Sequence, residues 1–424
     1  MKRRAFMSLA GGSLAGLRFF GPSRLWAASA ASLVGTPEKR FKYADELLHR
    51  LCAAGPAPAG SPAYEQRIRL ILAEMRRSIP DAFLDEYRIE GWEVVKPAEL
   101  TVGDARIETF CGNLSPGTPP EGVQGTLRKT GERIFSVVDS NGKQVATLHR
   151  STHKARASGY QPREQPTFSF GNHDLSIIEE AAAAGTLVRA GVQTRRTPNA
   201  PDWNAVGTIP GKSRDEILLL AHADTVYNAP GANDNAATVV VMLMLAHAFS
   251  RVQPEQTLTF VATGSEEHGD YLGAAHYAEV RQKAGNIRNI KWILNMDSLT
   301  YGADFGVSSQ SPEIKDLFAG VHKDLNIRNP YPGIKWRNND VVPGIELIDG
   351  DGWVMDAGPF QPSGGQAAFV YAVGQSAITH AVQHTPGDVP ATVPMNAVET
   401  TFLILEEAIK RFPRLSPDIS RPKS

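Results

Sequence analysis

The sequence predicts an α/β protein with a layered sheet, helices on the faces of that sheet, and a β-rich insert. From Ile217 onward, short apolar runs suited to strands alternate with helical runs, which is the pattern of a sheet covered by helices. Between about Trp92 and Pro198, short β-like runs, turn residues and polar loops replace that alternation. We therefore divide the chain into a main domain, residues 31–92 and 199–424, and an inserted domain, residues 93–198.

The composition is that of an ordinary globular protein. The chain has 424 residues, 42% of them hydrophobic and 21% charged, with a formal net charge of -1. Lysine and arginine are scattered rather than gathered into a stripe, so we expect no nucleic-acid partner. With only Cys52 and Cys111 the chain is no disulfide scaffold, although one bridge between them stays open.

The first thirty residues, 1–30, predict a removable export signal. The basic start Lys2-Arg3-Arg4 precedes an apolar, glycine-rich stretch, and Ala28-Ser29-Ala30 is a small-residue cleavage site. Paired arginines before such a stretch resemble a twin-arginine signal. The alternative is an anchoring helix, but Arg18 leaves the apolar run far short of the ~20 residues that a membrane span needs. We expect a periplasmic or secreted bacterial protein without a stable membrane anchor after cleavage.

The helices and strands follow in order from local patterns. After the signal, Tyr43–Leu51 and Tyr64–Ser78 have helical spacing, separated by a loop crowded with prolines and glycines. Within the insert, Ile134–Val138 predicts a strand, Asn141-Gly142 a turn and Leu175–Ala184 a helix.

The main domain continues with three strands and two helices. The strands are Ile217–Ala221, Thr257–Thr263 and Ile290–Asn295, and the helices are Ala236–Phe249 and Leu272–Val280. Acidic or histidine residues follow the strands closely, at His222, Glu267 and Asp297. Ligands of open α/β sheets bind at the carboxyl edge of the strands, so we expect the functional site there.

Five histidine and acidic residues of the main domain predict a metal centre. The motifs are His222-Ala223-Asp224, Gly231-Ala232-Asn233-Asp234-Asn235 and Gly264-Ser265-Glu266-Glu267, followed downstream by Asp297 and His384. Imidazole together with carboxylate suits zinc, whereas an all-oxygen cage would suit calcium or magnesium. The two imidazoles and three carboxylates of His222, Asp234, Glu267, Asp297 and His384 would suffice for two metal ions.

Simpler explanations exist for each residue, including a core histidine, a helix-capping Asp234 and solvated surface acids. The position of these residues at the ends of apolar strands favours the metal site. Asp224 could accept a hydrogen bond from the His222 ring nitrogen that faces away from the metal. Of the adjacent residues Glu266 and Glu267, one could bind metal while the other faces the substrate water.

The last ligand, His384, has one rival, and His268 is a separate competitor beside Glu267. We prefer His384 to His380, because Thr385-Pro386-Gly387-Asp388 holds it in a loop where Asp388 is available as an acceptor. We assign His268 a supporting or structural role.

In this order the five motifs resemble the co-catalytic zinc exopeptidases, which include bacterial leucyl aminopeptidase, aminopeptidase Y and carboxypeptidase Q. The resemblance covers roughly residues 42–412. It implies a mixed central sheet flanked by helices and two zinc ions bridged by Asp234. It also implies His222 and Asp297 on one zinc, Glu267 and His384 on the other, and Glu266 as general base. The insert resembles a protease-associated domain.

The resemblance implies a metallo-exopeptidase, foremost an aminopeptidase that removes N-terminal residues from peptides through a water activated by two zinc ions. Glutaminyl cyclases, which carry a single zinc, and non-catalytic receptor-like relatives are the alternatives. Around Val354–Tyr371 the chain departs from the family pattern, so a side-chain preference does not transfer. Amino- or carboxy-terminal trimming, the native metal and the oligomeric state stay open.

Overall fold

The computed structural model describes residues 35–157, 164–269, 271–301, 304–325, 345–373 and 382–414. The predicted export signal and His380 lie outside the described residues. Among the described helices, none has the length and apolar character needed to cross a membrane. Cys52 and Cys111 are free and buried in two different hydrophobic clusters, so they do not form the bridge that the sequence left open.

The expected mixed sheet is confirmed. Strand β9 (Ser213–His222) lies at its centre, with β10 (Gln256–Thr263) and β11 (Ile290–Asp297) parallel to it on either side. Next to β11 lies the parallel β14 (Gln366–Val373), followed by β12 (Asp304–Ser308) and β13 (Ile345–Ile348). On the other side β10 pairs antiparallel with β8 (Val188–Ile209).

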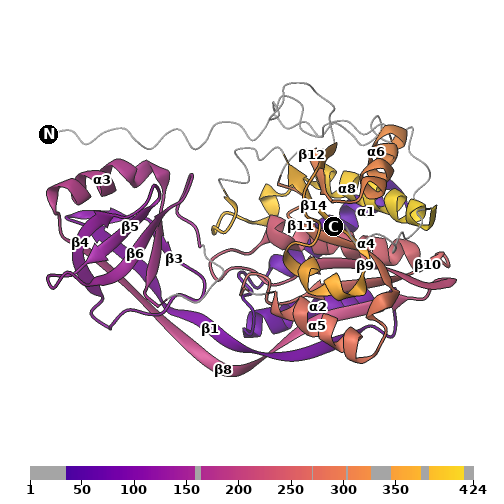
Figure 1. The fold of residues 1–424 in the computed structure, drawn as a ribbon, viewed down its shortest axis with the longest axis horizontal. Helices are drawn as coiled ribbons and strands as arrows, with labels where there is room; N and C mark the ends of the chain where they lie inside the picture. The colour runs from indigo at the N-terminus through magenta and orange to yellow at the C-terminus, as the bar shows by residue number, and fades with distance from the viewer. Residues whose placement is uncertain are drawn as a thin grey trace.

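Helices cover both faces of this sheet (Figure 1). Alternate residues of β9 point to opposite faces: Leu219 packs into the larger hydrophobic cluster and Leu218 into a smaller one. The helices that contribute to the larger cluster are α1 (Pro37–Cys52), α2 (Pro62–Arg76), α4 (Ala237–Phe249), α6 (Pro312–Leu325) and α8 (Met395–Arg411). The smaller cluster includes residues of α5 (Leu272–Lys283) and of the 3-10 segment η5 (Met355–Ser363).

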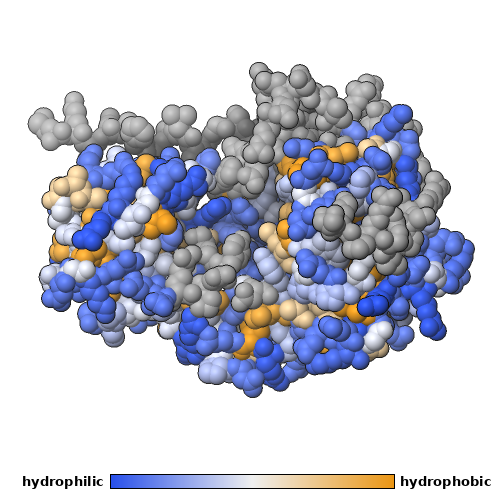
Figure 2. All heavy atoms as spheres, viewed as in Figure 1, coloured by the Kyte–Doolittle hydropathy of each residue, from blue (hydrophilic) through white to orange (hydrophobic). Residues whose placement is uncertain are grey.

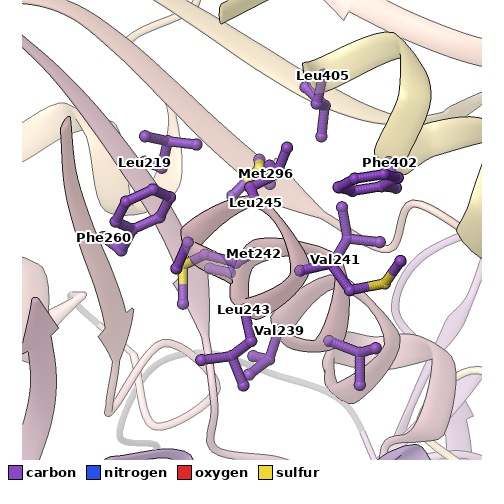
Figure 3. Close-up of a cluster of buried hydrophobic side chains, with 14 of the residues drawn as sticks. Leu219, Val239, Val241, Met242, Leu243, Leu245, Phe260, Met296, Phe402 and Leu405 are labelled. Carbon is purple, nitrogen blue, oxygen red and sulfur yellow. The ribbon is translucent and has the colours of Figure 1, made fainter. Parts of the chain in front are cut away.

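Helix α4 is the centre of the larger cluster (Figure 3). Its run from Val239 to Leu245 is apolar on every side, which is expected of a helix surrounded by protein. Phe260 and Leu219 approach it from the sheet, and Phe402 and Leu405 from α8. Because α4 begins just after Asp234, this packing also fixes where that carboxylate lies.

The N-terminal helices begin earlier than the sequence predicted, at Pro37 and Pro62 rather than at Tyr43 and Tyr64. Proline is favoured in the first helical turn because its missing N–H has no partner to lose there. At α2 the Ser61 hydroxyl also accepts a hydrogen bond from the Tyr64 amide.

A second group of strands lies beside the main domain (Figure 1). We call it the β-rich unit: strands β2 (Ala105–Ile107), β3 (Thr109–Cys111), β4 (Val123–Lys129), β5 (Ile134–Val138), β6 (Gln144–Arg150) and β7 (Thr167–Phe170), their connections, and helix α3 (Leu175–Ala184). It has its own hydrophobic cluster, which includes Phe135, Leu148 and Phe168. The predicted strand Ile134–Val138 and helix Leu175–Ala184 are confirmed with the same bounds.

Two long antiparallel strands, β1 (Phe83–Val102) and β8, join the β-rich unit to the main sheet. Both run through the predicted boundaries near residues 93 and 198, and the division of the chain at these residues stays a prediction.

Figure 2 shows mostly hydrophilic residues on the visible face, with hydrophobic residues scattered over it.

Candidate metal centre

The five predicted ligands meet at the carboxyl edge of the parallel strands. His222 and Asp297 are the last residues of β9 and β11, and Glu267 lies four residues beyond the end of β10. Asp234 lies in the π-helical turn η3 (Ala232–Ala236) that leads into α4. His384 lies in the loop before the 3-10 segment η6 (Pro390–Thr392) and adopts a left-handed φ of 56°.

The ligands form two groups that share Asp234. The first ligand group is His222, Asp234 and Asp297, and the second ligand group is Asp234, Glu267 and His384; within each, one ligand atom per residue lies within 4.8 Å of the others. His222 Nε2 is 3.2 Å from Asp234 Oδ1, and His384 Nε2 is 3.3 Å from Asp234 Oδ2. Each oxygen of the Asp234 carboxylate therefore faces a different imidazole, as a carboxylate that bridges two metal ions requires.

Two buried atoms of the centre have the character of metal ligands. His222 Nε2 and Glu267 Oε2 are shielded from solvent and make no hydrogen bond. A buried polar atom without a partner is costly, and coordination to a cation removes that cost. Among the residues that the structure describes, no lysine or arginine pairs with Asp234, Glu266, Glu267 or Asp297, so a divalent cation is the charge partner that fits this cluster.

The charges of the cluster perturb each other. Burial lowers the pKa of His222, but the carboxylates of Glu266, Asp234 and Asp297 outweigh burial and raise that pKa well above its usual value. Burial raises the pKa of Glu266 well above its usual value, and the nearby Glu267 and Asp297 add to the effect. Strongly perturbed carboxyl groups of this kind are typical of catalytic sites.

Asp224 fixes the two glutamates. Its carboxylate accepts one hydrogen bond from the Glu266 amide and one from the Glu267 amide, each 3.1 Å long, and it is fully buried. The predicted contact between Asp224 and His222 is present, but the acceptor is the backbone oxygen of Asp224 rather than its carboxylate. The Asp224 backbone oxygen lies 3.2 Å from His222 Nδ1, whereas the nearest carboxylate oxygen is 3.7 Å away. A proton on Nδ1 leaves the Nε2 lone pair free to bind metal.

Asp388 supports a different residue from the one predicted. Its carboxylate accepts hydrogen bonds from the Asn233 and Asp234 amides at 2.9 and 3.1 Å and from the Tyr301 hydroxyl at 2.9 Å. The acceptor that faces His384 Nδ1 is instead the Ala157 backbone oxygen, at 3.2 Å. The sequence assigned Asp388 to His384 because the two are close in sequence, but the turn between them directs Asp388 toward the loop of Asp234.

A buried polar network that the sequence did not reveal supports the Gly264–Glu267 turn. Ser265 has a left-handed φ of 60°, and its hydroxyl and that of Tyr87 both donate to the Asp202 carboxylate. Burial raises the pKa of Asp202 to about 6. A side chain on Gly264 would meet the Tyr87 hydroxyl at 2.6 Å, so the turn needs glycine there. No local pattern in the sequence connects Asp202 with residues more than sixty positions away.

The fold and the site together define the class of layered α/β proteins whose strand ends hold two overlapping metal-ligand groups. Solved structures with this fold include a peptidase M28 precursor from Shewanella amazonensis, with a TM-score of 0.69, 14% identity, and coverage of 88% of this chain and 95% of that one. A zinc aminopeptidase from Bacillus subtilis has a TM-score of 0.66 and 17% identity, with coverage of 89% and 97%. A glutaminyl cyclase from Porphyromonas gingivalis aligns with a TM-score of 0.50 and 13% identity, with coverage of 90% and 99%.

The model of peptidase family M28 matches residues 204–406, a segment that contains all five candidate ligands. Aminopeptidase YwaD of Bacillus subtilis is 25% identical over 270 residues, which cover 57% of this chain and 58% of the relative. A probable zinc metalloprotease of Pyricularia oryzae is 36% identical over 236 residues, covering 47% and 44%. The chain thus spans about half the length of the curated relatives that it matches.

Proposed function

We propose that this protein is a zinc-dependent metallo-exopeptidase that removes N-terminal residues from peptides. The observation that carries the proposal is the arrangement around Asp234. Two ligand groups share this carboxylate, and Glu266, which belongs to neither group, is held beside them through Asp224. A pair of metal ions with a separate carboxylate can activate a water molecule and transfer its proton, which are the two tasks in the hydrolysis of a peptide bond.

Zinc is the metal that the donor set fits, with two ions per chain. His222 and Asp297 would hold one ion, Glu267 and His384 the other, and Asp234 both. Bound there, zinc would lower the pKa of a water molecule and polarise the peptide carbonyl. The names of a zinc metalloprotease relative and of a zinc aminopeptidase with this fold support the choice of metal.

Glu266 would act as the general base. It would take the proton of the attacking water and deliver it to the leaving nitrogen. The hydrogen bonds from the Glu266 and Glu267 amides to Asp224 fix the backbone of both residues, so that their side chains serve different roles. Burial of Glu266, which is 4% exposed, keeps bulk water away from that proton.

The experiment measures zinc stoichiometry of the purified protein together with hydrolysis of aminoacyl anilides, dipeptides and carboxy-terminally blocked peptides. About two zinc ions with release of N-terminal residues supports the proposal. One zinc with cyclisation of an N-terminal glutamine would identify a glutaminyl cyclase, and neither metal nor turnover would identify a non-catalytic relative.

We also propose that the chain is exported by the twin-arginine route and acts in the periplasm or outside the cell. The support is Arg3-Arg4 before the apolar stretch and the small residues Ala28-Ser29-Ala30. Replacing both arginines with lysine is expected to keep the precursor inside the cell, detected as an uncleaved N-terminus.

For residues 93–198 we propose a protease-associated domain that limits which peptides reach the metal centre.

A further inference from the structure

The β-rich unit contacts the metal centre directly. Ala157, in the connection after β6, is fully buried against His384. Its backbone oxygen lies 3.2 Å from His384 Nδ1, and its amide donates to the His384 backbone oxygen at 3.1 Å. The backbone oxygen places the imidazole proton on Nδ1. His384 therefore presents Nε2 to Asp234 and Glu267.

A second contact reaches the other ligand of the same group. Asn113, which follows β3, is 6% exposed, and its side-chain amide donates to the Glu267 backbone oxygen at 2.8 Å. Glu267 is therefore held on one side by Asp224 of the main domain and on the other by Asn113 of the β-rich unit.

A third contact reaches the shared carboxylate through one intermediate. Arg156 donates to the Gln383 side-chain oxygen at 3.3 Å, and the Gln383 amide donates to Asp234 Oδ2 at 3.2 Å. That is the Asp234 oxygen that faces His384, not the one that faces His222. All three contacts thus lie on the second ligand group.

Arg156 and Ala157 contact the β-rich unit on one side and the main domain on the other. The Arg156 amide donates to the Ser169 hydroxyl of β7. Ala157 packs against Val226 and Ala229, in the loop between His222 and Asp234. In the same loop the Tyr227 hydroxyl accepts a hydrogen bond from the Cys111 amide at 2.9 Å.

The first ligand group is supported from within the main domain. His222 Nδ1 faces the Asp224 backbone oxygen, and the Asp297 carboxylate accepts a hydrogen bond from the Ser298 hydroxyl at 3.0 Å. Over the described parts of the chain, no hydrogen bond joins the β-rich unit to His222 or Asp297.

We propose that the β-rich unit is a structural part of one of the two metal positions, so that its attachment sets the metal affinity of the Glu267–His384 position and leaves the His222–Asp297 position largely unchanged. The inference rests on the proposed two-zinc function. Groups that hydrogen-bond to metal ligands typically change metal affinity by about 10- to 100-fold. Asn113 holds the Glu267 backbone rather than its carboxylate, so we expect an effect near the lower end of that range.

The test is stepwise removal of zinc by a competing chromophoric chelator from the full-length mature protein. Wild type is expected to release two zinc ions in two steps. In Asn113→Ala one step is expected to weaken by about 10-fold while the other stays within about 2-fold. Arg156→Ala is expected to weaken the same step by a smaller factor, because Arg156 acts through Gln383. Lys129→Ala is the matched control, since it removes an exposed ion pair with Glu179 in the same unit and should change neither step.

Anomalous diffraction from Asn113→Ala crystals after partial chelation identifies the weakened position, which should be the one beside Glu267 and His384. A wild type that holds one zinc overturns the two-zinc proposal, and this inference with it, before any variant is needed. A wild type with two zinc ions, in which Asn113→Ala and Arg156→Ala weaken both steps equally or neither step, overturns the inference alone. Circular dichroism spectra that match wild type ensure that the variants are folded.

Discussion

Replacing Asp224 with asparagine tests how the two glutamates are held. Both carboxylate oxygens of Asp224 accept a backbone amide, that of Glu266 and that of Glu267, at 3.1 Å each. Asparagine has one acceptor oxygen and one amino group in their place, so in either orientation one of the two backbone amides loses its acceptor and faces another donor. Asp224 is fully buried, so water cannot replace the lost acceptor.

The expected loss of activity follows from the loss of one hydrogen bond to the Asp224 carboxylate. A hydrogen bond to a charged group contributes about 1.5–3 kcal/mol, and about 1.4 kcal/mol corresponds to a factor of ten. If the displaced turn carries that loss into the transition state, kcat should fall by about 10- to 150-fold.

The assay is steady-state hydrolysis of an aminoacyl anilide at saturating zinc, with bound zinc measured in the same preparation. We expect the loss in kcat rather than in KM, because Asp224 positions the general base and does not contact substrate. Asp81→Asn, at an exposed aspartate, is the control and should match wild type. A kcat for Asp224→Asn within about 2-fold of wild type, with both zinc ions present, would show that Asp224 does not position the general base.

Three further substitutions test the roles of Glu266, Asp234 and Arg40. Glu266→Gln should keep both zinc ions and lower turnover by at least ~100-fold, because general-base catalysis contributes about 10²–10⁴-fold; near-normal turnover would remove Glu266 from that role. Asp234→Ala should bind markedly less zinc at both positions, and a purified variant with two full equivalents would contradict the bridging assignment. Arg40→Ala should lower the free energy of unfolding by about 3–5 kcal/mol in chemical denaturation, because it leaves Glu399 of α8 buried without its ion-pair partner; a loss below about 1 kcal/mol would contradict this.

Much of the main domain could be predicted because its signals are local. The apolar run Ile217–Ala221 predicts β9, and the run Ala236–Phe249 predicts α4, which begins one residue later. Metal-binding residue types at the ends of such runs predicted the five residues that the structure brings together in the two candidate ligand groups, and their role as ligands stays a prediction. The edge of a parallel sheet brings together residues that are far apart in sequence, and this geometric rule placed the site.

The supporting groups could not be predicted because they depend on tertiary placement. Ala157 meets His384 across 227 positions, through a backbone oxygen that leaves no mark in the sequence. Asn113 and Asp202 are ordinary polar residues until the chain folds around the Gly264–Glu267 turn. Asp388 was assigned to the wrong neighbour because its closeness to His384 in sequence was taken as closeness of the side chains.

The most direct test of the central claim, that Asp234 joins two zinc positions, is anomalous diffraction at the zinc edge from crystals of the wild-type protein. We expect two peaks about 3.5–4 Å apart, each about 2.0–2.2 Å from one oxygen of Asp234. One zinc should be bound also by His222 and Asp297, and the other by Glu267 and His384. A single peak, or two peaks of which either lacks Asp234 as a ligand, would contradict it.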